Sequence, residues 1–161
     1  MRGGRADGAA RPSLVLRAPE DAGGGEMSTP DWAATPFFRQ FGVTVEEARD
    51  GYARLSIPRE SVRLRGARDS INGGLVAVLG NAAMQVCLHT LMGPGERAGR
   101  THQLSVAFLD SARGEVTSIE ARMIRKGGRV AVGEVELRDT ADGTLNATLR
   151  VTCEVVRAKA P

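Results

Sequence analysis

The sequence predicts an α+β fold in which one long central helix is wrapped by a curved antiparallel sheet. Two observations carry this prediction: a helix-forming stretch that is apolar on nearly every side, and a later series of alternating segments separated by short glycine-containing turns. A helix without a polar face must be enclosed by other structure, and strands joined by tight turns pair antiparallel. With 161 residues, the chain is long enough for one domain with a hydrophobic core.

The long helix is predicted to run from Gly74 to about Leu91, where the sequence GPG at 93–95 ends it. Its interior is almost entirely aliphatic, with one asparagine, Asn81, inside the apolar run. Asparagine is a poor helix former and is costly to bury without partners. The amide at position 81 therefore requires either a structural or a functional explanation.

Two smaller elements are predicted before this helix. Thr35 precedes a proline that suits the first position of a helix, so the sequence predicts a short helix that Thr35 caps and Gly42 ends. Residues 43–58 read as two short strands that turn at Asp50-Gly51, a dipeptide that tolerates positive φ.

Four strands are predicted after the helix, as an antiparallel meander. The turns between them are marked by the sequences SARGE, KGGR and ADG. The last strand has the clearest alternation, since every second residue from 145 to 155 is apolar. The apolar face of that strand is Leu145, Ala147, Leu149, Val151, Cys153 and Val155.

Residues 1–30 are rich in glycine, alanine, arginine and proline and lack apolar periodicity. Such a segment cannot bury enough apolar surface to offset the entropy of ordering it. We therefore expect a disordered N-terminal arm at 1–30 and a folded domain at 31–157, with Met27 as an alternative start of the natural chain.

Composition excludes several classes of protein. The formal charge of +3 comes from 22 basic and 19 acidic residues, and aromatic residues make up 4% of the chain. Nucleic-acid platforms need clustered cations and stacking rings, so no nucleic-acid partner is expected.

No stretch is long and apolar enough for a membrane span or a signal peptide, so a cytoplasmic protein is expected. Cys87 and Cys153 have neither metal-ligand nor disulfide-framework spacing, so we expect two reduced core thiols and no metal.

Three segments resemble one family: INGG at 71–74, SVAFLDSA at 105–112, and RKGGRVAVGEVELRDTADGTLNATLRV at 125–151. Together with the order of elements, they resemble the hotdog-fold acyl-CoA thioesterases of the phenylacetate-degradation (PaaI) type, from Phe37 to Val156. The resemblance implies a hotdog fold, hydrolysis of an acyl-CoA thioester, and no cofactor beyond the coenzyme A that is part of the substrate.

The resemblance also implies a set of site residues. The family helix opens with His-Gly-Gly and carries an acidic residue nine positions after the histidine, and the matching residues here are Asn72 and Asn81. The first family glycine, matching Gly73, donates its backbone N–H to the thioester carbonyl, and Gly74 follows it beside the substrate. The hydroxyl that positions water in the family matches Thr101.

Spacing along the helix adds a constraint from geometry. Gly73 and Asn81 are eight residues apart, so at about 1.5 Å per residue they are separated by roughly 12 Å along the axis. A site that uses both must take Gly73 from one subunit and Asn81 from another. The resemblance likewise implies a site at a dimer interface, and we expect a homodimer or homotetramer.

Each candidate residue has a plainer explanation beside the functional one. Asn72 is a good N-cap, Asn81 is either a buried structural amide or a site residue, and Thr101 is equally an ordinary strand threonine. The hairpin with Arg125, Lys126 and Arg129 is either a solvated turn or a contact for the phosphates of coenzyme A.

Hydrolysis of an acyl-CoA is the leading function from sequence. Because an amide cannot accept a proton from water at neutral pH, Asn81 predicts slow turnover unless another group, such as Asp69, supplies the base. The alternative is a module that binds or senses acyl-CoA without cleaving it. A dehydratase or hydratase is less favoured, because proton abstraction beside a thioester needs a histidine with an acid at the helix start.

Overall fold

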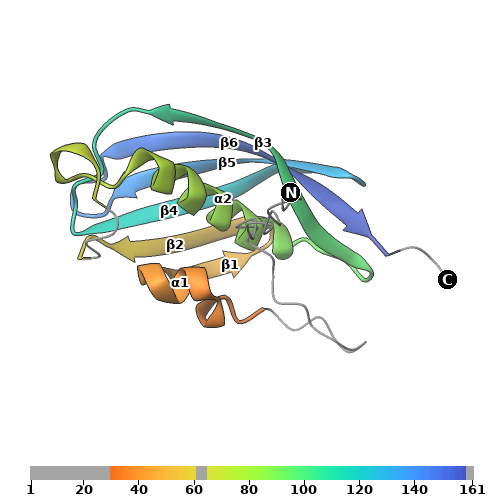
Figure 1. Ribbon diagram of the computed structural model, residues 1–161. Coiled ribbons are helices and arrows are strands. Elements are labelled where there is room, and N and C mark those ends of the chain that lie inside the picture. The colour runs from red at the N-terminus through yellow and green to blue at the C-terminus, as the bar shows by residue number, and fades with distance from the viewer. Residues whose placement is uncertain (1–29, 61–64, 159–161) are drawn as a thin grey trace, which may run out of the picture.

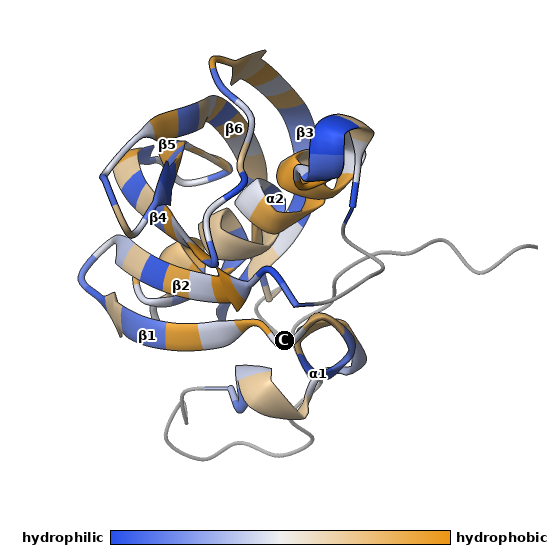
Figure 2. Ribbon diagram, turned by 90° about the vertical axis from the view of Figure 1, so that its left-hand side faces the viewer, coloured by the Kyte–Doolittle hydropathy of each residue, from blue (hydrophilic) through white to orange (hydrophobic). Residues whose placement is uncertain are grey.

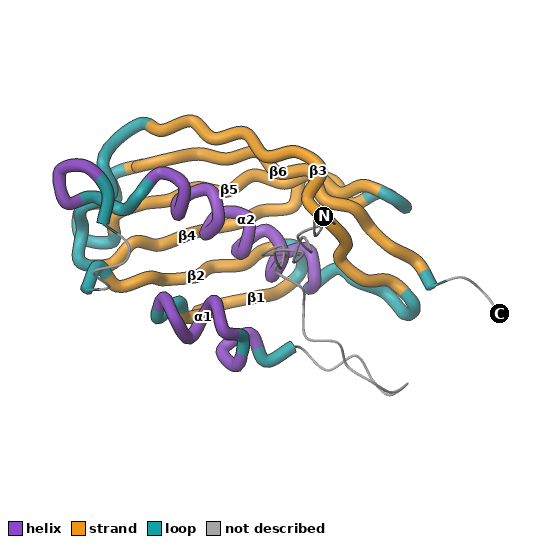
Figure 3. Tube along the Cα trace, viewed as in Figure 1, coloured by secondary structure: helices purple, strands orange, loops and turns teal. Residues whose placement is uncertain are grey.

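The computed structural model describes residues 30–60 and 65–158. A six-stranded antiparallel sheet curves around one long helix, as Figures 1 and 3 show. The predicted hotdog architecture is therefore confirmed. The expected disorder at residues 1–30 concerns a segment that, apart from Pro30, lies outside the described residues.

The elements follow one another in the predicted order up to the long helix. They are the 3-10 turn η1 (Trp32–Ala34), helix α1 (Pro36–Phe41), strands β1 (Thr44–Arg49) and β2 (Tyr52–Pro58), the 3-10 turn η3 (Ala67–Asp69), helix α2 (Gly73–His89), and strands β3 (Glu96–Phe108), β4 (Val116–Lys126), β5 (Val130–Asp139) and β6 (Leu145–Arg157).

The strands lie in the order β1-β2-β4-β5-β6-β3, so the predicted four-strand meander is wrong. Strand β3 pairs with β6 at one edge of the sheet, and β4 pairs with β2 instead of β3. Tight turns join β4 to β5 and β5 to β6, whereas residues 109–115 carry the chain from β3, at one edge, to β4 in the interior of the sheet. Alternation in sequence defines strands but not their neighbours, which is why the pattern misplaced β3.

Helix α2 packs its apolar surface against the inner face of the sheet (Figures 1 and 2). Gly80 allows this close packing, because a Cβ there would lie 2.5 Å from the Cδ2 atom of Leu149 on β6. The absence of a polar stripe on α2 is thus explained by contact with β strands over most of its circumference. The buried residues of the helix are Val76, Leu79, Gly80, Ala82, Ala83, Met84, Gln85, Val86, Cys87 and Leu88.

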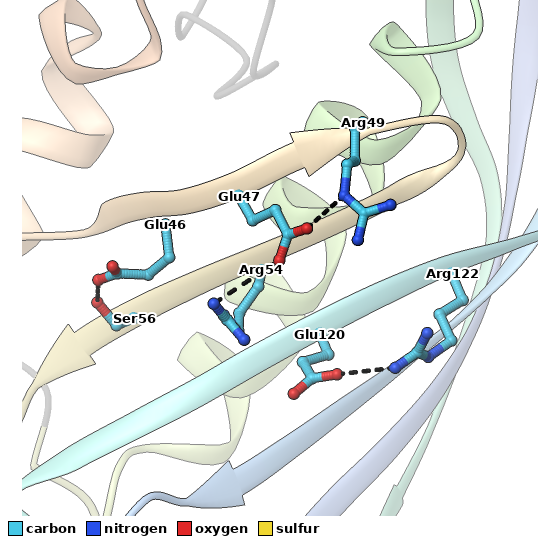
Figure 4. Close-up of polar contacts among 7 residues, drawn as sticks. All are labelled: Glu46, Glu47, Arg49, Arg54, Ser56, Glu120 and Arg122. Atoms are coloured by element: carbon cyan, nitrogen blue, oxygen red, sulfur yellow. Dashed lines mark hydrogen bonds and ion pairs between the residues drawn. The ribbon is translucent and has the colours of Figure 1, made fainter.

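The outer face of the sheet is charged, as the close-up in Figure 4 shows for β1, β2 and β4. Glu47 pairs with Arg49 and Arg54, and Glu120 pairs with Arg122. Exposed pairs of this kind contribute little stability each. They keep this face solvated, so the apolar side of the sheet is the one that α2 covers.

Local turn chemistry follows the sequence with one exception. The β1–β2 turn has positive φ at Asp50 (45°) and Gly51 (76°), and α1 ends at Gly42 with φ 61°, both as predicted. The Thr35 side chain does not cap α1, because its hydroxyl donates to the carbonyl of Trp32 at 2.8 Å. No helix in the described part of the chain is long and apolar enough to cross a membrane.

Candidate active site

The start of α2 holds the first group of candidate residues. The side-chain oxygen of Asn72 accepts a hydrogen bond from the N–H of Gly74 at 2.9 Å, so the predicted N-cap is confirmed. Gly73 is the first residue of the helix, and the N–H groups of a first turn have no acceptor within the helix. Asn72 accepts from the N–H of Gly74, and the N–H of Gly73 donates to no backbone acceptor outside the helix within the described residues, so it is available to a ligand.

A phenylalanine ring lies directly against this helix start. A Cβ on Gly73 would lie 3.2 Å from Cζ of Phe108, the last residue of β3. Phe108 is 60% exposed and Leu109 beside it is 57% exposed, so the helix terminus is bordered by open apolar surface. Gly73 therefore lets the ring lie close to the helix start and leaves room around its N–H.

The second group lies in the middle of α2 and answers why an amide interrupts the apolar helix. The hydroxyl of Thr101 on β3 donates to Oδ1 of Asn81 at 2.6 Å. Gln85, one turn further along α2, donates from Nε2 to the same hydroxyl oxygen at 3.3 Å. Asn81 and Thr101 are both half-buried, so this polar cluster borders solvent.

Two irregularities in β3 place Thr101 in this position. The register with β6 passes from Ala98 opposite Val155 to Thr101 opposite Cys153, and then to Gln103 opposite Thr152. Each step adds one residue to β3 relative to β6. Bulges turn a side chain away from its regular direction and are common beside functional sites. Thr101 lies between two of them and reaches the helix.

One chain does not bring the two groups together. Both lie on the same straight element, and Gly73 and Asn81 are eight residues and thus about 12 Å apart along its axis. The structure therefore joins Asn81 to Thr101 and separates both from Gly73, as the helical spacing predicts.

Sequence reasoning missed Gln85, whereas the prediction of two reduced core thiols at Cys87 and Cys153 is confirmed. Nε2 of Gln85 lies 3.6 Å from Sγ of Cys153, and the Thr101 hydroxyl lies 3.7 Å from the same sulfur. The spacing i, i+4 from Asn81 was a usable signal, because residues at that spacing share one helix face. Both cysteines are buried free thiols, and burial raises the pKa of Cys87 to about 12 and also raises that of Cys153.

Asp69 does not offer a free base near the helix start. Its carboxylate forms ion pairs with Arg59 and with Arg65, the latter at 2.9 Å. Asp69 and Arg68 both have positive φ, at 62° and 56°, in the turn that leads into α2. The two arginines engage both carboxylate oxygens, so Asp69 holds this turn together.

The β4–β5 hairpin carries one cation that is paired within the protein, Lys126, and two that are exposed, Arg125 and Arg129. The ammonium group of Lys126 lies 2.5 Å from Oε2 of Glu96, at the start of β3. Arg125 and Arg129 are exposed and form no ion pair within the described residues. Of the three cations predicted to meet phosphates, Lys126 is thus engaged inside the protein and the two arginines are open to solvent.

The Glu96 ion pairs predict a pH-dependent stability. The hydrogen bond from Lys126, then the N–H of Gly93 and the guanidinium of Arg157, lower the pKa of the Glu96 carboxyl to about 2 from 4.5. A lowered pKa stabilises the fold above the unfolded value, and this contribution is lost as pH falls from about 4.5 towards 2. We expect E96Q to lower Tm at pH 7, and the difference in Tm from wild type should shrink as pH falls from about 4.5 towards 2. Thermal melts over this pH range measure the difference, and the exposed change Glu115→Gln is the control. A difference in Tm that does not vary with pH would contradict the prediction.

Fold and site together define a hotdog protein with a helix-terminus donor and a separate polar cluster on the same helix. Two solved structures share the fold. A thioesterase family protein from Silicibacter pomeroyi has a TM-score of 0.72 at 21% identity, covering 78% of this chain and 93% of that one. A thioesterase from Haemophilus influenzae has a TM-score of 0.70 at 14% identity, covering 78% of this chain and 85% of that one.

Sequence comparison assigns the family. Residues 69–146 match the thioesterase superfamily. The chain is also 34% identical over 107 residues to the "Putative esterase VNG_1336C" of Halobacterium salinarum, covering 63% of this chain and 70% of that protein. The chain belongs to the thioesterase superfamily, and its class of chemistry is hydrolysis of a thioester bond.

Proposed function

We propose that this protein hydrolyses an acyl-CoA thioester at a site shared by two copies of the chain. The observation that carries the proposal is the pairing of Asn81 with Thr101 in a solvent-bordering cluster, about 12 Å along the helix from the available N–H of Gly73. Gly73 of one copy and the Asn81–Thr101 pair of the other complete one site, related by a two-fold axis.

In this site the helix terminus polarises the substrate. The N–H of Gly73 and the partial positive charge of the first turn stabilise negative charge on the thioester oxygen as water attacks the carbonyl carbon. The C–S bond then breaks, the thiolate of coenzyme A takes up the proton that the attacking water has lost, and the thiol and the free acid leave. Asn72 supports this step by capping the helix, and Gly74 leaves the approach to the terminus open.

The proposed turnover is slow, because none of the three candidate positions considered for a base offers a free carboxylate. Position 81 carries an amide, Asn72 is an N-cap, and Asp69 is ion-paired with two arginines. A positioned general base contributes about 10²- to 10⁴-fold to rate. The same observation favours the second candidate, a module that binds or senses acyl-CoA without cleaving it.

A substrate panel separates the two functions. Purified protein is incubated with acyl-CoA thioesters of different chain length and with aryl acyl-CoA, and both thiol release and binding are measured. Release of coenzyme A supports the hydrolase, and binding without release supports the sensing module. Failure to bind any of these thioesters would exclude both the hydrolase and the binding module.

The composite site requires assembly. Strand β3 is an edge strand, and its exposed Phe108 and the neighbouring Leu109 lie beside the helix start. An unpaired edge with apolar side chains favours association with a second chain. We expect light scattering at micromolar concentration to give a dimer or a tetramer. A monomer would contradict the shared site.

The exposed arginines of the β4–β5 hairpin are proposed to contact the phosphates of coenzyme A. The β4–β5 hairpin lies beside the start of β3, where Lys126 meets Glu96, whereas the end of β3 lies against the start of α2, so within one chain the hairpin is far from Gly73 and serves a site completed by the other copy (Figure 1). We expect Arg125→Ala with Arg129→Ala to weaken coenzyme A binding and flatten its salt dependence, because screening acts on exposed charges. Calorimetry measures the affinity for coenzyme A. An affinity that the double variant leaves unchanged would mean that the hairpin is an ordinary solvated turn.

A further inference from the structure

We propose that Gln85 is a positioning residue that fixes the orientation of the Asn81 amide, so that Asn81 presents its N–H₂ group, and not its oxygen, to the ligand. The inference rests on the proposed function for the identity of the ligand. The orientation itself follows from the hydrogen bonds of three side chains, Gln85, Thr101 and Asn81.

The direction of these hydrogen bonds is set by how many hydrogens each group has. Nε2 of Gln85 donates to the Thr101 oxygen at 3.3 Å. A threonine hydroxyl has one hydrogen, and here it is donated to Oδ1 of Asn81 at 2.6 Å. Because the oxygen of Asn81 is engaged by Thr101, the nitrogen of the same amide is the atom left for a ligand.

The reverse orientation is less favourable for a chemical reason. If Nδ2 of Asn81 faced Thr101, the hydroxyl oxygen would accept from two amides, and its hydrogen would have to turn to another acceptor. The neighbouring group is Sγ of Cys153 at 3.7 Å, and a thiol sulfur is a weak acceptor. The reversal therefore exchanges a short O–H···O bond for a weak O–H···S contact.

Burial protects this arrangement from water. Gln85 is 7% exposed, so solvent does not compete for its donors. The nitrogen of Asn81 has no acceptor among the described residues. Within those residues, the buried side-chain polar atom that lacks a hydrogen-bond partner is Oδ1 of Asn146. The nitrogen of Asn81, which also lacks a partner, is therefore not buried and can be reached from solvent. The free donor of Asn81 thus points to where a ligand can reach it.

The ligand group that fits a free N–H₂ donor is an oxygen acceptor. With Gly73 of the other copy, Asn81 supplies a second N–H to the thioester oxygen, so these two residues contribute two hydrogen-bond donors, and neither can take a proton from water. This assigns Asn81 a role in binding the carbonyl and excludes it as a group that takes a proton from water.

Gln85→Glu tests the inference through pH. A protonated glutamic acid can still donate to Thr101, as Gln85 does, whereas the carboxylate only accepts, so the Thr101 hydroxyl would turn to residue 85 and the Asn81 amide would reverse. The first readout is hydrogen exchange of the Asn81 side-chain amide by NMR. At high pH we expect exchange in Q85E to slow by about tenfold, the factor of one hydrogen bond of about 1.4 kcal/mol, once intrinsic exchange is corrected for. At low pH it should equal wild type.

The second readout is binding of two coenzyme A thioethers, S-(2-oxo-2-phenylethyl)-CoA and S-(2-phenylethyl)-CoA, which differ in one carbonyl oxygen. We expect wild type to prefer the ketone at all pH values, and Q85E to lose several-fold of that preference at high pH and regain it at low pH. Gln40→Glu, an exposed change of the same chemistry on α1, should keep the wild-type preference.

Gln85→Met is the second variant if Q85E does not fold, because methionine has a similar shape and no N–H donor. It should reduce the ketone preference without any pH dependence. Asn81 exchange that is unchanged in both variants would overturn the inference. If wild type binds neither thioether, the proposed function fails, and the exchange measurement still decides the role of Gln85.

Discussion

Replacing Asn81 with aspartate is expected to raise kcat, since a positioned general base contributes about 10²- to 10⁴-fold, and to raise KM, since the N–H₂ donor to the thioester oxygen is lost. The side chains are nearly isosteric, and the Thr101 hydroxyl that now donates to Oδ1 at 2.6 Å would donate to one carboxylate oxygen. The second oxygen is then free to accept the proton of the attacking water. The gain arises in the proton-transfer transition state, so it appears in kcat. Steady-state kinetics with the best substrate of the panel measure it.

Asn72→Asp is the matched control for this change. Asn72 accepts from the N–H of Gly74 at 2.9 Å, and a carboxylate caps a helix start equally well. This control should therefore fold normally and show no comparable gain. If Asn81→Asp instead abolishes existing turnover in a folded protein, the amide is itself the working group. A missing base would then be the wrong explanation of slow turnover.

Most of the fold was predictable because burial leaves a periodic trace in the sequence. The inward face of β6 alternates through Leu149, Val151 and Cys153, and α2 is apolar around its circumference because the sheet encloses it. The position of β3 was not predictable in this way. Its partner is β6, and its link to β4 runs through residues 109–115 and forms no tight hairpin, so local pattern carried no information about that edge.

The candidate site likewise has residues that local sequence pattern places and residues that only tertiary structure places. Asn72, Gly73 and Asn81 lie on one helix, where spacing gives their separation directly. Thr101 came from the family resemblance, because the bulges that direct it towards Asn81 depend on pairing with β6. The Lys126–Glu96 pair joins positions 30 residues apart and leaves no local signal. Contacts that tertiary structure alone creates were therefore the ones that sequence reasoning lacked.

Replacing Gly73 with proline is expected to lower kcat by about 10²- to 10³-fold, the usual loss when one oxyanion donor is removed. Proline removes the N–H and suits the first position of a helix. The preceding residue, Asn72, has φ −60° and ψ 133°, which is the extended conformation that a residue before proline prefers. The fold should therefore survive, as circular dichroism can verify. Gly73→Ala is the control, since it keeps the N–H and brings only a Cβ to 3.2 Å from the Phe108 ring.

Mixing two defective chains then tests whether the donor and the cluster come from different copies. One chain carries Gly73→Pro with Asn81→Asp, and the other keeps Gly73 and carries Asn81→Ala, so neither alone has both groups intact. In a two-fold dimer, half of a random mixture is heterodimer, and each heterodimer has one complete site of two, so co-expression should restore about one quarter of the activity of the Asn81→Asp protein. A site built within one chain predicts no recovery at all, because no single chain then carries both the Gly73 N–H and the base.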